Sequence, residues 1–178
     1  NIIVMKKTVL PAIMGVIVAL SACNNQAGNE SNIELNLDSI RENAKAQADV
    51  DKTSLVMKNG LLLNAAQEVP ANNSPASGTV NISYNKENRM LSYTVNWDGL
   101  TDKPTMAHIH GTAPRGENAG VKHDLTAVIP KEKSGSFSDS VLVDGSVIKE
   151  DSLLAGFYYF NIHTPAHPGG EIRCQIEF

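Results

Sequence analysis

The feature of this sequence that most constrains its fold is an alternation of apolar and polar residues on both sides of a polar turn. The turn is Asn-Lys-Glu-Asn-Arg at positions 85–89. Apolar side chains occupy every second position before and after it: Val80, Ile82, Tyr84, Leu91, Tyr93, Val95 and Trp97. A period of two places these side chains on one face of a strand, so the segment predicts a hairpin with one buried face.

Further strands are expected toward the C-terminus, at positions 134–143, 158–163 and 171–178. Residues 146–156 can hold one short helix that Gly156 closes. Many short strands separated by Gly, Pro and Asn predict an all-β fold, an antiparallel β-sandwich of Greek-key type with one short helix. We expect a monomer whose core contains Tyr93, Trp97, Phe160, Ile162, Ile172 and Ile176.

The first residues are typical of a secretory signal. Lys6 and Lys7 precede an apolar run at 9–20, which ends in Leu-Ser-Ala-Cys at 20–23. The run is too short to span a bilayer comfortably. We expect translation to start at Met5 and residues 1–22 to be removed. The Leu-Ser-Ala-Cys motif resembles the lipobox of bacterial lipoproteins. In those proteins the cysteine, here Cys23, is lipidated and anchors the protein to the membrane.

The rest of the chain then divides into a tether and a domain. Residues 23–53 are expected to be the lipidated cysteine and a flexible tether, part of it helical, and residues 54–178 the β domain. Asn24 stands where enteric bacteria use aspartate to retain lipoproteins at the inner membrane, which favours the outer membrane of a bacterial cell envelope. A net charge of −4 gives no basic surface for nucleic acid.

Three motifs in a fixed order resemble a known family. They are Gln-Glu-Val-Pro at 67–70, His-Ile-His-Gly at 108–111, and a closing segment at 161–175 that contains Asn-Ile-His-Thr and Gly-Glu-Ile-Arg-Cys-Gln. Together they resemble the CHRD domain, a module named after chordin and common in secreted bacterial proteins, over residues 60–177. Cys174 stands where the family usually has Gly. The resemblance implies an extracytoplasmic all-β domain and no particular reaction.

Strand alternation also predicts which face the polar residues occupy. In the last strand Ile172, Cys174 and Ile176 belong to the core face, so Cys174 is expected to be buried and unreactive. With Cys23 lipidated, Cys174 also has no partner for an intrachain disulfide. The same alternation gives one polar face to His108, His110, Asn161, His163, Glu171 and Arg173.

This polar face supports two hypotheses. Two histidines at i and i+2, His108 and His110, can reach one ion, and His163 from another strand completes a ligand set suited to copper or zinc. His167 in the following turn could join them. In the other hypothesis, the histidines form hydrogen bonds with strand ends and loops, and Glu171 and Arg173 form an ion pair.

No Ser-His-Asp order, phosphate-binding loop or pair of carboxylates points to catalysis. We therefore expect a membrane-anchored binding or structural module without catalytic activity, which meets an unidentified protein or small-molecule partner. The alternative is a periplasmic copper- or zinc-binding protein with a remote likeness to copper-zinc superoxide dismutase.

Overall fold

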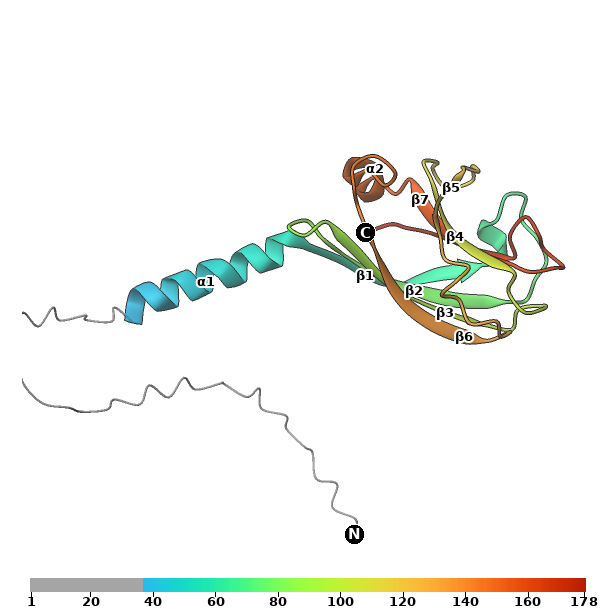
Figure 1. The fold of residues 1–178 in the computed structure, drawn as a ribbon, viewed down its shortest axis with the longest axis horizontal. Helices are drawn as coiled ribbons and strands as arrows, with labels where there is room; N and C mark the ends of the chain where they lie inside the picture. Colours follow the sequence, from blue (N-terminus) through green and yellow to red (C-terminus); the bar gives the residue numbers. More distant parts are fainter. Residues whose placement is uncertain (1–36) are drawn as a thin grey trace, which may run out of the picture. The chain divides into compact units, whose positions relative to one another are not determined.

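The computed structural model describes residues 37–178 (Figure 1). The predicted signal segment, Cys23 and the first part of the predicted tether lie outside the described residues. Helix α1 (Leu37–Ser54) occupies the later part of that tether, where partial helix was expected. Of the helices from residue 37 onward, none is both long and apolar enough to cross a membrane.

Eight strands, all paired antiparallel, form one sheet in the order β5-β4-β7-β8-β1-β2-β3-β6. The all-β antiparallel fold is thereby confirmed. The predicted short helix is α2 (Glu150–Leu154), followed by Gly156 at φ +78°. The strands are β1 (Leu55–Asn64), β2 (Ser77–Asn85), β3 (Met90–Asp98), β4 (Met106–Gly111), β5 (Val121–Asp124), β6 (Gly135–Leu142), β7 (Tyr158–His163) and β8 (Ile172–Gln175), with a 3-10 turn at Ala65–Gln67.

The sheet has two halves that face each other across the core. Strands β5-β4-β7-β8 form one half and β1-β2-β3-β6 the other, and the Asn64–Arg173 pair joins them. Across the core, the rings of Tyr93 in β3 and Phe160 in β7 pack edge to face with centroids 5.0 Å apart. The sandwich therefore arises from a single sheet that folds over itself (Figure 1).

The apolar core occupies the space between the halves. All six predicted core residues, from Tyr93 to Ile176, are at most 3% exposed, and Cys174 is buried among them. Removal of this apolar surface from water is the main stabilising contribution to such a domain.

A finding that the sequence did not predict is that the polar face of β4, β7 and β8 is buried as well. His108, His110, Asn161 and His163 are buried, and so are Glu171, Arg173 and Gln175. Loops cover this face, and they are joined where the Asn118 side chain donates to the Val69 carbonyl at 2.7 Å. The domain therefore has a buried polar layer between the outer face of β4, β7 and β8 and the loops that cover it, in addition to the apolar core between the two halves of the sheet.

Candidate metal centre

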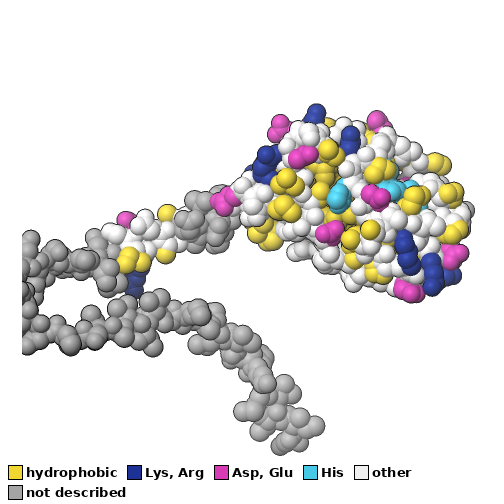
Figure 2. Space-filling model, viewed as in Figure 1, with side chains coloured by type: hydrophobic (Ala, Val, Ile, Leu, Met, Phe, Trp, Pro, Cys, Tyr) yellow, Lys and Arg dark blue, Asp and Glu magenta, His cyan; other side chains and the backbone are white. Residues whose placement is uncertain are grey.

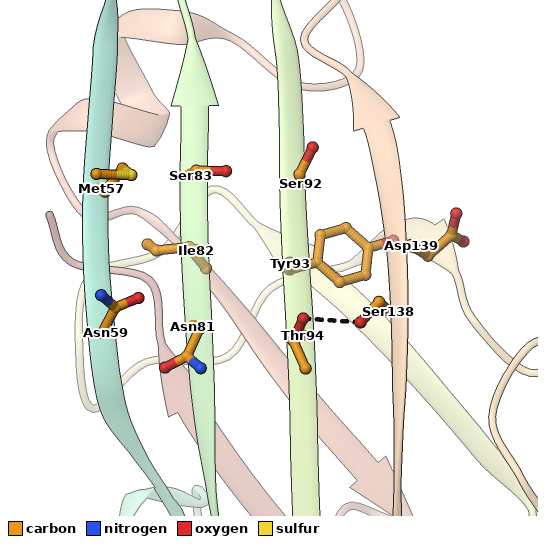
Figure 3. Close-up of a pocket in the computed structure, with 10 residues that line it drawn as sticks. All are labelled: Met57, Asn59, Asn81, Ile82, Ser83, Ser92, Tyr93, Thr94, Ser138 and Asp139. Atoms are coloured by element: carbon orange, nitrogen blue, oxygen red, sulfur yellow. Dashed lines mark hydrogen bonds between the residues drawn. The ribbon is translucent and has the colours of Figure 1, made fainter. Parts of the chain in front are cut away.

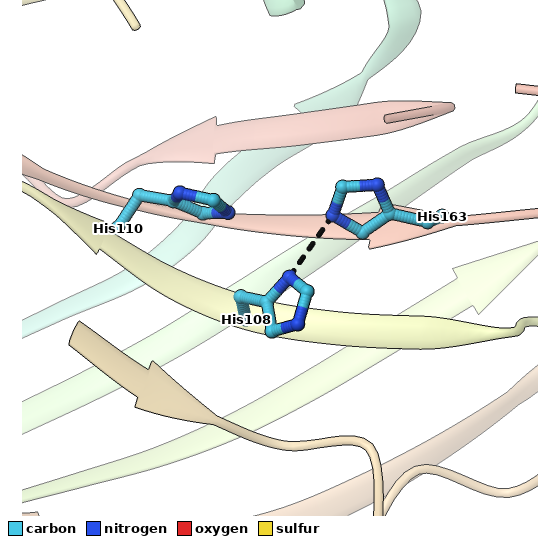
Figure 4. A group of neighbouring side chains, drawn as sticks. All are labelled: His108, His110 and His163. Carbon is cyan, nitrogen blue, oxygen red and sulfur yellow. Dashed lines mark hydrogen bonds between the residues drawn. The ribbon is translucent and has the colours of Figure 1, made fainter. Parts of the chain in front are cut away.

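Two neighbouring strands bring the three predicted histidines together. β4 supplies His108 and His110 on alternate positions, and β7 supplies His163, with His108 opposite Asn161 in the register. The ring centroid of His108 lies 4.9 Å from that of His163 and 5.3 Å from that of His110. One nitrogen from each ring lies within 4.8 Å of the others (Figure 4). The three histidine residues are at most 9% exposed.

Backbone carbonyls determine the tautomers of two rings. His163 Nδ1 lies 2.9 Å from the Pro168 oxygen, and His110 Nδ1 lies 2.8 Å from the Ala119 oxygen. A carbonyl oxygen only accepts, so both Nδ1 atoms carry the hydrogen. Each Nε2 then presents a lone pair. The Nε2 of His110 is buried with no partner in hydrogen-bond geometry, although the Asn161 side chain lies near enough to raise the pKa of this ring against the lowering effect of burial. A buried polar atom without a well-formed hydrogen bond is a costly state.

His108 faces the other two rings through its Nδ1. This atom lies 3.1 Å from His163 Nε2, while His108 Nε2 lies 3.8 Å from Asp124 Oδ1. Two nitrogens that bind one tetrahedral ion at about 2.05 Å are about 3.3 Å apart, which the His108–His163 pair nearly matches. The three nitrogens lie within 4.8 Å of one another, so the rings must draw slightly closer together to share one ion. Two carbonyls and one carboxylate lie behind the rings, as is usual for metal-binding histidines. The residues present therefore fit a metal ion.

The electrostatics keep these rings neutral. Burial lowers the pKa of His108, His110 and His163 below the usual value. The neighbouring His163 and His110 rings lower the pKa of His108 further. A metal ion binds the neutral imidazole, so the cluster is in the required protonation state at neutral pH.

Tyr159 and Arg173 hold His110 in place. The Tyr159 ring stacks on His110 with an interplanar angle of 4° and a centroid separation of 4.8 Å. The Arg173 guanidinium carbon lies 3.4 Å from the centroid of the Tyr159 ring. Strand alternation assigns Tyr159 to the same face as Asn161 and His163, but the sequence analysis did not include it among the site residues.

A family model for the CHRD domain matches residues 60–176. The chain belongs to the CHRD domain family. This confirms the resemblance and supports a binding or structural module. Comparison with curated proteins and with solved structures gives no match.

Within the CHRD domain, the second hypothesis for the polar face holds in part. His110 and His163 form the expected hydrogen bonds with loop carbonyls, but the ion pair between Glu171 and Arg173 is wrong. Glu171 Oε1 accepts from the Ser74 hydroxyl at 2.6 Å and from the Thr101 N–H at 2.8 Å. Burial raises the pKa of Glu171, but these hydrogen bonds and those from Thr164 outweigh it and lower the pKa. Strand alternation gives Glu171 and Arg173 the same face. The Glu171 carboxylate nevertheless takes its hydrogen bonds from hydroxyl and amide groups of the loops and not from Arg173.

The buried guanidinium of Arg173 interacts electrostatically with Glu68 instead. It also donates a hydrogen bond to the neutral side chain of Gln175, with 2.9 Å between Arg173 Nη2 and Gln175 Oε1. Burial raises the pKa of Glu68 to about 7 against the lowering effect of Arg173. Oε1 of Glu68 is buried without a hydrogen-bond partner. Glu68 is therefore partly protonated near neutral pH.

Two predicted polar residues remain, Asn161 and His167. The first contacts the group of three histidines and the second does not belong to it. The side-chain amide of Asn161 is 3.0 Å from His163 Nε2, so this side chain borders the centre. Because His163 Nε2 is an acceptor in the tautomer set by Pro168, the NH2 group of the Asn161 amide, not its oxygen, faces this nitrogen. His167 is not part of the group of converging nitrogens and lines a hollow of about 240 Å³ between residues 68–72 and 166–170. The structure thus brings three of the four candidate ligands together.

Proposed function

We propose that this chain is a lipid-anchored CHRD module of a bacterial cell envelope that binds a copper or zinc ion through His108, His110 and His163. The buried, unpartnered Nε2 of His110 carries the proposal. It lies beside the ring nitrogens of two other neutral histidines. A metal ion would give this atom its missing partner, whereas an apolar side chain there would serve a purely structural site better.

The proposed role is binding, without turnover. Three imidazoles hold an ion by neutral ligands, and the acids nearby have other roles. Glu171 is engaged by hydroxyl and amide donors, and Glu68 lies beside Arg173. On the face drawn in Figure 2, histidine atoms reach the surface between hydrophobic and acidic side chains.

Metal titration of the purified full chain tests the proposal. The metal-free protein is titrated with Zn²⁺ and with Cu²⁺ in a calorimeter. We expect one ion per chain with a Kd of about 1 µM or lower. His110→Ala should abolish binding. His123→Ala is the matched control, because His123 pairs with Ile109 and belongs to the opposite strand parity. Failure of the wild-type chain to bind either ion would contradict the proposal.

A second function, a metal-free partner-binding module, has one observation in its favour. His163 Nδ1 already donates to Pro168, so His108 Nδ1 donates to His163 Nε2 across 3.1 Å. This hydrogen bond satisfies two of the three rings without a metal. In that case added Zn²⁺ or Cu²⁺ would leave the thermal unfolding temperature unchanged, whereas a bound ion should raise it.

Membrane anchoring through Cys23 is a separate part of the proposal. Its support is the Leu-Ser-Ala-Cys box behind a basic and apolar leader. Cys23→Ala should move the protein from the membrane fraction to the soluble fraction, and mass spectrometry of the wild type should find acyl chains on Cys23. A variant that stays membrane-bound would refute this anchor. We propose the outer membrane as its location, which Asn24 after the cysteine favours where the cell has one.

A further inference from the structure

We infer that Met106 is a fourth ligand of the histidine centre and makes it selective for Cu(I) over Zn²⁺. The inference rests on the proposed metal site and adds a residue and an oxidation state to it. It starts from the position of a methionine at the beginning of β4, directly before the His-x-His pair.

Strand parity places Met106 on the face of the histidines. Ala107 and Ile109 of β4 belong to the apolar core, so Met106 alternates with them and shares the parity of His108 and His110. Met106 is also the direct partner of His163 in the antiparallel register. Side chains of directly opposed residues leave the same face with Cβ atoms about 5 Å apart. The thioether and the His163 ring therefore leave the sheet side by side.

The backbone at the start of β4 is hydrogen-bonded to the end of β7, whereas the Met106 side chain is partly exposed to solvent. The N–H of Thr105 donates to the His163 carbonyl at 2.9 Å, which fixes the start of β4 against the end of β7. Met106 itself is 38% exposed, next to rings that are nearly buried. Its unbranched side chain has three rotatable bonds. It can thus fold over the rings without any movement of the strands.

The chemistry of this ligand set favours a soft, singly charged ion. Thioethers select Cu(I), whereas zinc sites use thiolate, imidazole and carboxylate. Three neutral imidazoles and one thioether supply no negative charge. The positive charge of Arg173 also lies near this site, since its guanidinium carbon is 3.4 Å from the centroid of the Tyr159 ring, which stacks on His110. A monovalent ion is repelled less by Arg173 than a divalent one.

Paired affinity measurements on the full chain test the inference. Cu(I) affinity is measured without oxygen by competition with a chromogenic Cu(I) chelator, and Zn²⁺ affinity by competition with a fluorescent zinc chelator. Met106→Leu keeps the size and apolar character of the residue and removes the sulfur. We expect it to weaken Cu(I) binding by about tenfold or more and to leave Zn²⁺ binding unchanged.

The matched control is Met57→Leu. Met57 is also an exposed methionine, at 59%, but it lines a shallow hollow on β1, in the other half of the sheet, with Ser83, Ser92 and Thr94 (Figure 3). This control should keep full Cu(I) affinity. X-ray absorption of the Cu(I)-loaded chain should show a sulfur neighbour in the wild type and in Met57→Leu, and none in Met106→Leu.

The outcomes separate this inference from the proposed function. If the wild type binds metal and Met106→Leu binds Cu(I) as tightly, the fourth ligand is wrong and the histidine site stands. An equal loss of Cu(I) and Zn²⁺ affinity would give Met106 a packing role and also overturn the inference. If neither ion binds to the wild type, the proposed metal function itself fails.

Discussion

His108 and His163 are 55 positions apart in the chain, and Nδ1 of the first lies 3.1 Å from Nε2 of the second. This contact joins β4 to β7 inside a region where charge is costly. Both rings are buried, and each must remain neutral for the contact to persist. The protonation of these rings therefore links the stability of the domain to pH.

Acid should destabilise the metal-free domain through these histidines. Burial lowers the pKa of His108, His110 and His163 in the folded state, so near their usual pKa of about 6.5 the unfolded chain binds more protons. Their contribution to stability is present above that pH and is lost as the pH falls. In urea unfolding, the loss of stability of the wild type relative to a variant with all three replaced by Gln should grow from about pH 8 to about pH 5, because Glu68 is common to both proteins and cancels in the comparison. Parallel profiles would contradict this prediction.

Glu68 should act with the opposite sign. Burial raises its pKa from 4.5 to about 7, so the folded state holds a proton that the unfolded chain releases between those values. Stability from this residue is thus lost as the pH rises toward 7 and above. A shift of this size corresponds to roughly 3 kcal/mol. Glu68→Gln should stabilise the domain at about pH 8 and have little effect at about pH 4, measured by urea unfolding. A uniform effect at both pH values would count against it.

Phe160→Ala should reduce the free energy of unfolding by about 3–5 kcal/mol, because it leaves a cavity in the core. Phe160 is buried and packs against Tyr93 from the opposite half of the sheet. The matched control is Phe157→Ala, since Phe157 is 39% exposed. The control should cost much less in the same chemical unfolding experiment. A cost below about 1 kcal/mol for Phe160→Ala would mean that the two halves do not share this core.

Cys174 should be unreactive in the folded domain. It lies in the apolar core, and burial raises its pKa to about 12, so almost no thiolate is present. In a Cys23→Ala variant Cys174 is the only thiol of the chain. A chromogenic disulfide reagent should therefore label it only after denaturant is added. Rapid labelling under native conditions would show that β8 opens or that its parity is wrong.

The centre was only partly predictable, and the reason differs from residue to residue. His108, His110 and His163 were assigned to one face because alternation within a strand is a local property of the backbone. That β4 lies beside β7 could not be read from the sequence, because it depends on pairing between distant segments. Tyr159 was missed because an aromatic residue on a polar face has no separate signal. Glu171 was assigned the wrong partner because the two loops that carry Ser74 and Thr101 could not be placed from the sequence.

The sequence by itself determined the hairpin around the turn at 85–89, the three strands toward the C-terminus, the short helix before Gly156 and the apolar core, because each follows from a period of two or from a local backbone preference. Strands β1 and β5 were not predicted. Only the tertiary structure decided the order of the strands and the burial of the polar face. That order depends on which non-local pairing covers the most apolar surface while it satisfies the buried polar groups. The convergence of three imidazoles is a result of that pairing and of the loops that close over it.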